Sequence, residues 1–408
     1  MAQRQFAKAS ITEKAERSLR SGHPWVFGEE VVSVAGEYEN GDLVDVYSKK
    51  DRFLGTGFIN DVSKIRIRLI SRNANDRFDD EFFRRRIRWC IDYRLAVIGE
   101  NEDCWRVIFG EADQFPGLTV DRFGDVLVVQ VLSLGFERMK RRLFGLLIDV
   151  FAEYGVRIRA ICERSDAAIR LKEGLEEEKG FYRDPRLDPD FDGKLIIEEN
   201  GVKYGIDVLN GQKTGFFLDQ KFNRRACAAI ARGRRVLDCF THTGAFALNC
   251  AAAGAEHVTA VDISEDAIAQ TRRNAALNGL EGRMDFVCED VFDLLTSMEE
   301  QKNCGYDFII LDPPAFTKSR GTVGSAIKGY KAINAKAMKL LPRGGYLATC
   351  SCSHFMTDEL FRKMLHDAAE DAGVQLRQIE GRQQAGDHPI LWNVPETDYL
   401  KFYIFQVV

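Results

Sequence analysis

Hydrophobic and polar positions alternate over three short stretches near the N-terminus, at residues 42–47, 53–59 and 64–70. A period of two residues is typical of half-buried strands, and the Gly, Asn and Asp residues between these stretches are typical of turns. The third stretch alternates Lys or Arg with Ile or Leu, which predicts one apolar face and one basic face. We therefore predict a small β-rich barrel over residues 1–72.

A different pattern begins at Asp79, a residue type that caps helix N-termini. Phe83, Ile87, Ile91 and Leu95 follow at helical spacing and predict a helix. Strand-like segments at 105–109, 125–131 and 160–163 and a helix near 136–153 come next. The polar, Pro- and Asp-rich stretch 183–190 is typical of a linker. Residues 73–192 are thus predicted to form a central α+β domain.

Strands alternate with helices over residues 193–408. Strands are predicted at 235–238, 257–262, 284–288, 307–312, 345–350 and 400–408, and helices at 244–253, 265–278, 291–300, 325–341 and 357–372. The strands are mostly apolar, as strands buried on both faces of a parallel sheet are. This pattern predicts a doubly wound, Rossmann-like domain with a mostly parallel sheet, and makes the whole chain a multidomain α/β protein.

The composition is that of an ordinary globular protein, with 45% hydrophobic and 29% charged residues over 408 positions. No apolar run reaches the roughly 18 residues that span a bilayer, and the first eight residues lack the apolar segment of a secretory signal. The ten cysteines include no Cys-x-x-Cys, and the Cys350-x-Cys352 spacing does not suit zinc. We therefore expect no metal, no membrane contact, reduced thiols and a cytoplasmic location.

The net charge of −5 argues at first against a nucleic-acid partner. By segment, however, residues 1–72 carry +2, residues 73–192 carry −5 and residues 193–408 carry −2. The acidic excess is therefore concentrated away from the N-terminal segment. Binding to RNA remains open, and it is expected to be local and dependent on RNA shape.

Acidic residues end successive strands of the C-terminal sheet, where ligands bind in such folds. Asp238 suits a ligand with a positive amino group, Asp262 suits ribose hydroxyls, and Glu289-Asp290 suits an adenine amino group. The loop after Asp238 holds only Gly244, unlike the glycine-rich loop of dinucleotide sites. A fourth strand leads into Asp312-Pro313-Pro314-Ala315-Phe316. Any one acid alone is an ordinary helix cap, whereas the combination predicts a nucleoside cofactor.

Several longer motifs carry a family resemblance. They are 22–27 and 41–46 near the N-terminus, 110–113 and 116–122 in the middle, and 213–220, 312–316 and 351–353 in the last part. With them the whole chain resembles the RlmI-like class I methyltransferases, which use S-adenosylmethionine to form 5-methylcytosine in large-subunit ribosomal RNA. The resemblance implies an N-terminal RNA-binding PUA-like barrel, a central α+β domain and a class I methyltransferase domain with a seven-stranded, mostly parallel sheet.

The resemblance also implies a set of cofactor-binding residues for S-adenosylmethionine. They are Gln220, Arg224, Asp238, Phe240, Thr243, Gly244, Asp262, Ile263, Ser264, Asp290 and Asp312. Arg224 is expected to pair with the cofactor carboxylate, since a guanidinium matches that geometry. The ordinary alternative is an exposed helix arginine.

Methylation of a cytosine carbon needs a nucleophile, because C5 reacts only after a thiolate has added to C6. Cys352 follows a predicted strand end and matches the family nucleophile, whereas Cys350 aligns with a Thr-Cys-Ser run of related enzymes. We favour Cys352. Asp312 is the second catalytic candidate, placed to hydrogen-bond the base, and Phe316 is a candidate for stacking on it. Core packing is the alternative for Phe316.

Two other functions stay open at this point. Asp-Pro-Pro-x-Phe also resembles the motif of enzymes that methylate exocyclic amines of guanine or adenine, and these need no cysteine. The third possibility is an RNA-binding module with a vestigial cofactor site. Candidate RNA-guiding residues are Lys14, Arg17, Arg20, Lys64, Arg66, Arg68 and Arg84–Arg88, with Lys318, Arg320, Lys328 and Lys331 around the Asp-Pro-Pro loop. Solvated surface charges are the alternative, and the oligomeric state, monomer or homodimer, is left open.

Overall fold

The structure is a computed structural model that describes residues 6–99, 102–211, 214–301, 305–317 and 319–408. Lys213 and Lys318, named above, lie outside these residues. The chain forms two compact units. The first comprises Met1–Leu195, Ile206–Leu218 and Gly386–Thr397, and the second comprises Ile196–Gly205, Asp219–Ala385 and Asp398–Val408.

A six-stranded sheet with the order β2-β6-β5-β4-β1-β3 opens the first unit. Its elements are β1 (Ala7–Ile11), α1 (Glu13–Arg20), β2 (Trp25–Val26), β3 (Val31–Ala35), β4 (Leu43–Tyr47), β5 (Phe53–Ile59) and β6 (Ile67–Ser71). The predicted strand 64–70 begins only at Ile67, because a turn closed by the hydrogen bond from Asn60 N to Arg66 O takes up the preceding residues. The inward residues, such as Val44, Ile59 and Leu69, form a small core.

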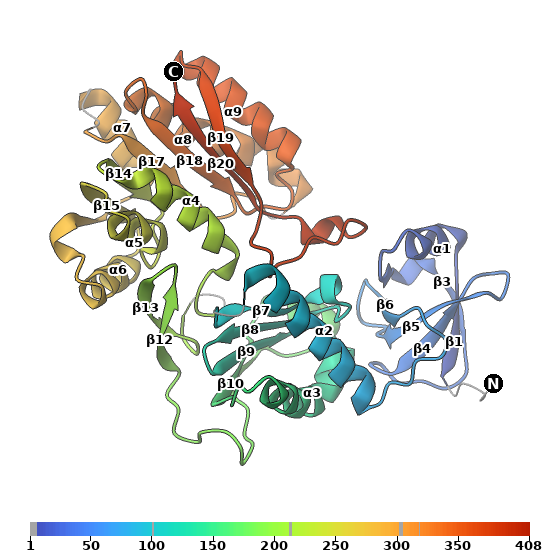
Figure 1. Ribbon diagram of the computed structural model, residues 1–408. Coiled ribbons are helices and arrows are strands. Elements are labelled where there is room, and N and C mark those ends of the chain that lie inside the picture. The colour runs from blue at the N-terminus through green and yellow to red at the C-terminus, as the bar shows by residue number, and fades with distance from the viewer. Residues whose placement is uncertain (1–5, 100–101, 212–213, 302–304, 318) are drawn as a thin grey trace. The chain divides into compact units, whose positions relative to one another are not determined.

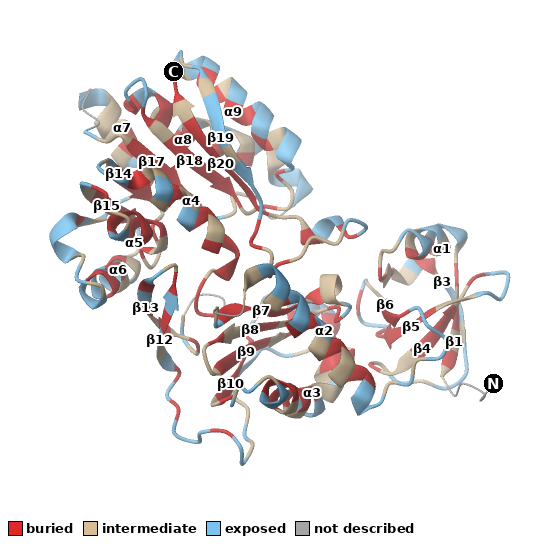
Figure 2. Ribbon diagram, viewed as in Figure 1, coloured by how far each residue is buried: buried red, intermediate tan, exposed pale blue. Residues whose placement is uncertain are grey.

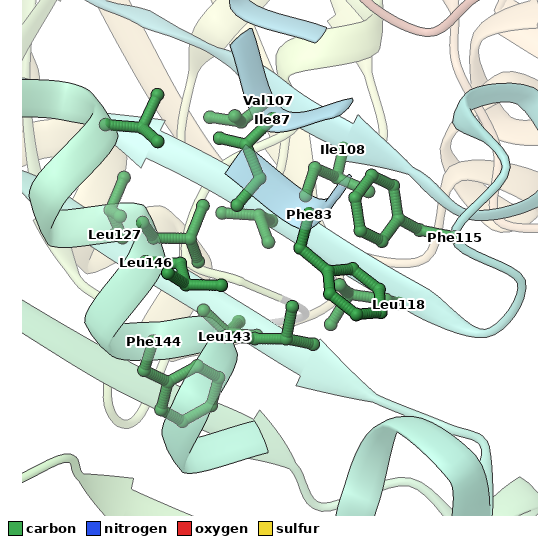
Figure 3. Packing of buried hydrophobic residues seen from close by; sticks show 14 of the residues in the cluster. Phe83, Ile87, Val107, Ile108, Phe115, Leu118, Leu127, Leu143, Phe144 and Leu146 are labelled. Carbon is green, nitrogen blue, oxygen red and sulfur yellow. The ribbon is translucent and has the colours of Figure 1, made fainter. Parts of the chain in front are cut away.

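A five-stranded sheet with the order β11-β10-β9-β8-β7 follows in the same unit. Its elements are α2 (Asp80–Ile98), β7 (Cys104–Phe109), β8 (Leu118–Phe123), β9 (Val126–Val131), α3 (Leu134–Glu153), β10 (Ala160–Ser165) and β11 (Glu178–Phe181). Asp79 caps α2 as predicted, accepting a hydrogen bond from Phe82 N at 3.0 Å. Figure 3 shows apolar residues of α2 and α3, among them Phe83 and Leu143, packed over the sheet.

The second unit contains the predicted seven-stranded sheet, with the order β16-β15-β14-β17-β18-β20-β19. A hairpin of β12 (Lys194–Glu199) and β13 (Val202–Asp207) precedes it. The strands are β14 (Arg235–Cys239), β15 (His257–Asp262), β16 (Met284–Cys288), β17 (Phe308–Leu311), β18 (Tyr346–Ser351), β19 (Leu376–Arg382) and β20 (Lys401–Val407). The first five strands in chain order pair in parallel, and β20 pairs antiparallel to both β18 and β19.

Helices cover both faces of this sheet, as the continuous apolar strands predict (Figure 1). They are α4 (Lys221–Ala231), α5 (Ala245–Ala252), α6 (Glu265–Leu277), α7 (Val291–Gln301), α8 (Val323–Leu340) and α9 (Asp358–Ala372). Figure 2 shows the central strands buried along their length and the outer surfaces of α6 and α9 exposed. Within the described residues, no helix is both long and apolar enough to cross a membrane.

Candidate functional site

The carboxyl ends of four parallel strands meet at one edge of the seven-stranded sheet. The register places Cys239 beside Val261 and Leu311, and Leu311 beside Thr349. Asp238, Asp262, Asp312 and Cys350 adjoin these positions and therefore share that edge, and Cys352 follows directly after the end of β18. Parallel pairing aligns the ends of neighbouring strands, and the sequence-based expectation that these acids lie close together rests on that alignment.

Asp238 is the next-to-last residue of β14 and is almost completely buried. Its Oδ2 accepts hydrogen bonds from Thr241 Oγ1 at 2.6 Å and from the Ala247 backbone at 2.9 Å, which ties the strand end to the start of α5. Oδ1 is buried without a partner in the described part of the chain. Burial raises the pKa of Asp238 to about 7, and nearby Asp312 and Asp262 act in the same direction.

The loop between β14 and α5 has an unusual backbone. Phe240 and His242 have φ values of 65° and 52°, and Gly244 has 84°. A Cβ at Gly244 would lie 2.6 Å from Thr271 Cγ2, so this position needs glycine for both its conformation and its space. The Thr243 hydroxyl oxygen is buried with no partner among the residues described. Such a tight loop lets its backbone approach a ligand closely.

The second and third strand ends present their acids as expected. Asp262 accepts hydrogen bonds from the backbone nitrogens of His242 and Ser264, at 2.9 and 3.0 Å, and thereby holds the two loops together. Ser264 caps α6. Ile263 is 68% exposed, which leaves an apolar surface at this edge of the sheet. Asp290 accepts from Phe292 N at 2.7 Å just before α7.

Gln220 positions Asp312 at the same edge. Its Nε2 lies 3.2 Å from both carboxylate oxygens of Asp312, and its Oε1 accepts from Asn223 Nδ2 at 2.6 Å. Gln220 is 4% exposed, so this amide is a fixed part of the site. Gln220 and Asp312, both named in the predicted cofactor site, are thus neighbours, with the glutamine orienting the aspartate.

Arg224 has a different role from the expected one. Its Nε and one terminal nitrogen bind the two carboxylate oxygens of Glu199 at 2.6 and 2.9 Å. Both side chains are almost completely buried, with 1% of each residue exposed. The guanidinium fork already meets a carboxylate within the protein, so the geometry does not support a pairing with the cofactor carboxylate. Glu199 lies in β12, and the sequence reading assigned it no role.

The two candidate nucleophiles differ in accessibility. Cys350 lies inside β18 opposite Phe402 and is 0% exposed. Burial raises the pKa of the Cys350 thiol well above its usual range. Cys352 follows the strand end and is partly exposed. A nucleophile must reach its substrate, so this difference favours Cys352.

Lys401 is a second residue for which the sequence predicted no role. It is 4% exposed, and its ammonium donates to the backbone oxygens of Ser353 at 2.7 Å and Tyr399 at 3.0 Å. Burial lowers the pKa of Lys401 to about 8, while the negative forms of Asp398, Cys352 and Asp358 raise it. A cation beside a thiol favours the thiolate. The signal in the sequence is the one charged residue, a lysine, in a mostly apolar and aromatic strand.

Other candidate residues already have contacts within the protein. Phe316 is partly buried and packs on Tyr330 of α8, with ring centroids 4.5 Å apart, at the margin of the core. This contact favours the alternative of core packing for Phe316. Lys331 pairs with Asp371 on α9 at 2.7 Å.

Most of the candidate RNA-guiding cations of the first unit also have acidic partners. The pairs are Lys14–Glu30, Arg20–Glu16, Arg66–Asp61, Arg68–Glu173, Arg84–Asp149, Arg85–Asp76 and Arg88–Glu153. The predicted basic face of the strand at 64–70 is thus largely neutralised.

The residues at the sheet edge fit S-adenosylmethionine. The unpartnered Oδ1 of Asp238 is an acceptor suited to the amino group of the methionine part. Asp262 and the exposed Ile263 suit ribose and adenine. Gly244 allows the loop its left-handed turn, because a Cβ there would clash with Thr271.

Comparison with known proteins supports these observations. A profile described as S-adenosylmethionine-dependent methyltransferase matches residues 190–390, and one described as PUA-like domain matches residues 10–72. The ribosomal RNA large subunit methyltransferase I of Pseudoalteromonas atlantica is 41% identical over 404 residues, covering 98% of this chain and 100% of that protein. The protein of the same name from Klebsiella pneumoniae (strain 342) is 38% identical and covers 99% of each chain.

Solved structures resemble the fold over nearly the whole chain. A candidate S-adenosylmethionine-dependent methyltransferase from Streptococcus mutans has a TM-score of 0.80 at 22% identity, covering 98% of this chain and 100% of that one. A candidate methyltransferase complexed with SAH has a TM-score of 0.81 with the same identity and coverage.

Proposed function

Because the chain belongs to the ribosomal RNA large subunit methyltransferase I family, whose methyl donor is S-adenosylmethionine, we propose that it methylates C5 of a cytosine in large-subunit ribosomal RNA. The observation that carries the proposal is the placement of a partly exposed cysteine, Cys352, at the same sheet edge as Asp238, Asp262 and Asp312. Enzymes that methylate exocyclic amines need no such thiol.

Each residue has a defined task in this proposal. S-adenosylmethionine, when bound, supplies an electrophilic methyl group. Cys352 adds its thiolate to C6 of the cytosine, forming an S–C6 bond that makes C5 nucleophilic. Asp312, oriented by Gln220, hydrogen-bonds the base and stabilises the charge that develops in the ring. After C5 has gained the methyl group, the C5 proton passes to water and the S–C6 bond breaks, which releases the Cys352 thiolate and restores the aromatic ring.

Lys401 and Arg224 have supporting roles in this proposal. Lys401 holds a positive charge near Cys352 and favours its thiolate at neutral pH. Arg224, fixed by Glu199, supports the helix that carries Gln220 and Asn223 toward the site. We also propose the boundaries 1–72, 73–192 and 193–408 for the barrel, the central domain and the methyltransferase domain.

Nucleoside mass spectrometry of ribosomal RNA from a strain lacking the gene tests this function. Loss of 5-methylcytosine, restored by the wild-type gene, is the expected result. Loss of a methylated purine contradicts the proposal and favours amine methylation, and an unchanged profile favours a binding module.

The nucleophile is tested separately with matched cysteine variants. Cys352→Ala should abolish methyl transfer and leave S-adenosylhomocysteine binding intact, whereas Cys350→Ala should retain transfer. The reverse pattern would show that Cys350 is the nucleophile.

A further inference from the structure

A cleft with a volume of 570 Å³ lies in the first unit, where β6 leads into α2. The residues used below that line it are Arg72, Asp76, Arg85, Arg86, Trp89 and Gln114. It lies outside the methyltransferase site described above, since none of these residues belongs to the second unit. The cleft thus needs its own explanation.

The most unusual residue in the cleft is Arg86, which is 5% exposed. One terminal nitrogen of the Arg86 guanidinium donates to the backbone oxygen of Gln114 at 3.0 Å, and the guanidinium lies 4.4 Å from the centre of the Phe82 ring. Within the described residues, no carboxylate oxygen lies within 4.0 Å of it. Burial lowers the pKa of Arg86 to about 10.

Other buried arginines of the same unit show what Arg86 lacks. Arg94 binds both oxygens of Asp113 at 2.7 and 2.6 Å, and Arg170 binds Glu137 at 2.9 Å. A buried cation without a paired anion is costly, and its cost falls when an anion binds. The position of Arg86 in an open cleft therefore indicates an anionic ligand.

Trp89 adds an aromatic surface to this charge. It lies one helical turn after Arg85 and Arg86 and is 58% exposed. The Arg85 guanidinium lies 5.4 Å from its ring centre. An exposed indole beside cations is the combination on which unpaired bases stack, whereas duplex RNA offers no free base face.

The charge of the cleft favours a polyanion. Arg72 is exposed and donates to the His23 backbone oxygen at 3.3 Å. Among the described residues, no carboxylate lies within 4.0 Å of its guanidinium. Asp76 is the opposing carboxylate in the lining, and it accepts from Ser71 at 2.5 Å and lies 3.5 Å from Arg85. Three arginines against one aspartate leave an excess of two positive charges.

We propose that this cleft binds an unpaired nucleotide of the RNA substrate, with its phosphate at Arg72 and Arg86 and its base on Trp89. The inference rests on the proposed function for the identity of the partner as RNA. It adds a second point of attachment, in the first unit, to the cytosine site in the second unit. An acidic peptide is the competing ligand, and competition with poly-glutamate distinguishes it from RNA.

The test measures binding of the full-length protein to a fluorescein-labelled RNA hairpin with a single-stranded tail. Trp89→Ala should weaken binding by about five- to 150-fold, the range for loss of one base stack. Trp89→Phe keeps an aromatic face and should remain close to the wild type. Arg72→Gln should weaken binding and reduce the salt slope by about 0.7, the value for one single-stranded phosphate.

Two controls make the result specific. Arg141→Gln removes another exposed arginine, on α3 and outside the cleft, and should change nothing. A blunt duplex of the same stem should bind equally to the wild type and to Trp89→Ala. If Trp89→Ala weakens the blunt duplex as much as the tailed hairpin, or if a poly-glutamate peptide competes as well as the tailed RNA, the proposal is overturned.

A methyl-transfer assay separates this inference from the proposed function. With ribosomal RNA from the deletion strain as substrate, the Trp89→Ala and Arg72→Gln variants should raise KM for RNA and leave kcat unchanged. If the wild type transfers methyl groups but both variants keep KM within twofold, the cleft proposal fails alone. If the wild type transfers none, the proposed function fails, and the binding data on the tailed hairpin still decide the cleft.

Discussion

Asp238 should make cofactor binding depend on pH, because its pKa of about 7 lies far above that of an ordinary aspartate. The free protein holds this carboxyl in a buried position where Oδ1 has no partner within the described residues. An amino group of the ligand stabilises the ionised form, so binding requires removal of the proton. Ligand affinity should therefore fall as the pH drops below 7.

The magnitude follows from the fraction of Asp238 that is ionised. With a pKa of about 7, about half of the carboxyl is ionised at pH 7.0 and about 3% at pH 5.5. The dissociation constant should thus rise about 15-fold between these two values. Both lie below the roughly 7.7–8.0 at which an α-amino group titrates, so the ligand keeps its positive charge throughout.

Isothermal titration calorimetry with S-adenosylhomocysteine measures this effect without turnover. Asp238→Asn should bind about 10- to 150-fold more weakly at pH 7.0, since it loses a hydrogen bond to a charged group worth about 1.5–3 kcal/mol. Its affinity should stay nearly constant down to pH 5.5. A wild-type change below threefold, or an equal fall in Asp238→Asn, would refute the reasoning.

The same carboxyl should lower the stability of the ligand-free protein as the pH rises. Its folded-state pKa is raised, so the unfolded chain loses this proton first, at about pH 4, and the folded state follows at about pH 7. The contribution of Asp238 to the free energy of unfolding is fully present below about pH 4. It is lost progressively between pH 4 and pH 7, by at most about 4 kcal/mol. Asp238→Asn should consequently melt higher than the wild type at pH 8, and this difference should vanish near pH 4.

Three further changes test other parts of the site. Glu199→Gln leaves Arg224 charged and buried and should reduce the free energy of unfolding by about 3–5 kcal/mol in urea titrations; the Glu199→Gln/Arg224→Met pair should recover part of this loss. Gly244→Ala should lower stability by about 1–2 kcal/mol and weaken S-adenosylhomocysteine binding, because its φ is 84° and its Cβ would meet Thr271 at 2.6 Å. Lys401→Met should slow both alkylation of Cys352 by iodoacetamide and methyl transfer at pH 7 by about tenfold, with Lys401→Arg partly restoring both; unchanged rates in Lys401→Met would remove its assigned role.

The sequence predicted the elements of the methyltransferase sheet closely because its apolar strands and helix caps are local signals. It also predicted that the strand-end acids converge, since parallel register alone brings Asp238, Asp262 and Asp312 to one edge. The sequence did not predict which side chains pair with one another. Arg224 meets Glu199, which lies 25 residues away on a separate hairpin, and nothing in the local pattern marks the pair. Contacts of this kind depend on tertiary packing.

The arginines of α2 show the same limit. Four of them follow within five positions, and the sequence presents them as one basic segment. In the structure Arg84 and Arg88 meet Asp149 and Glu153 of α3, whereas Arg86 meets a backbone oxygen. Much of the acid of the first unit is therefore used to neutralise its own arginines.

This pairing predicts a weak salt dependence for RNA binding despite the many basic residues. A cation already paired with a carboxylate releases few counterions when RNA arrives, so mainly the unpaired cations contribute. If Arg72 and Arg86 are the main contacts to the tail, they should give a slope of log Kd against log salt concentration of about 1.4 for single-stranded phosphates. Titrations of the tailed hairpin between about 50 and 200 mM salt measure it. A slope above about 4 would mean that the paired arginines leave their carboxylates and bind phosphate. RNA would then bind over a broad electrostatic surface, and not mainly through the local phosphate contacts proposed for Arg72 and Arg86.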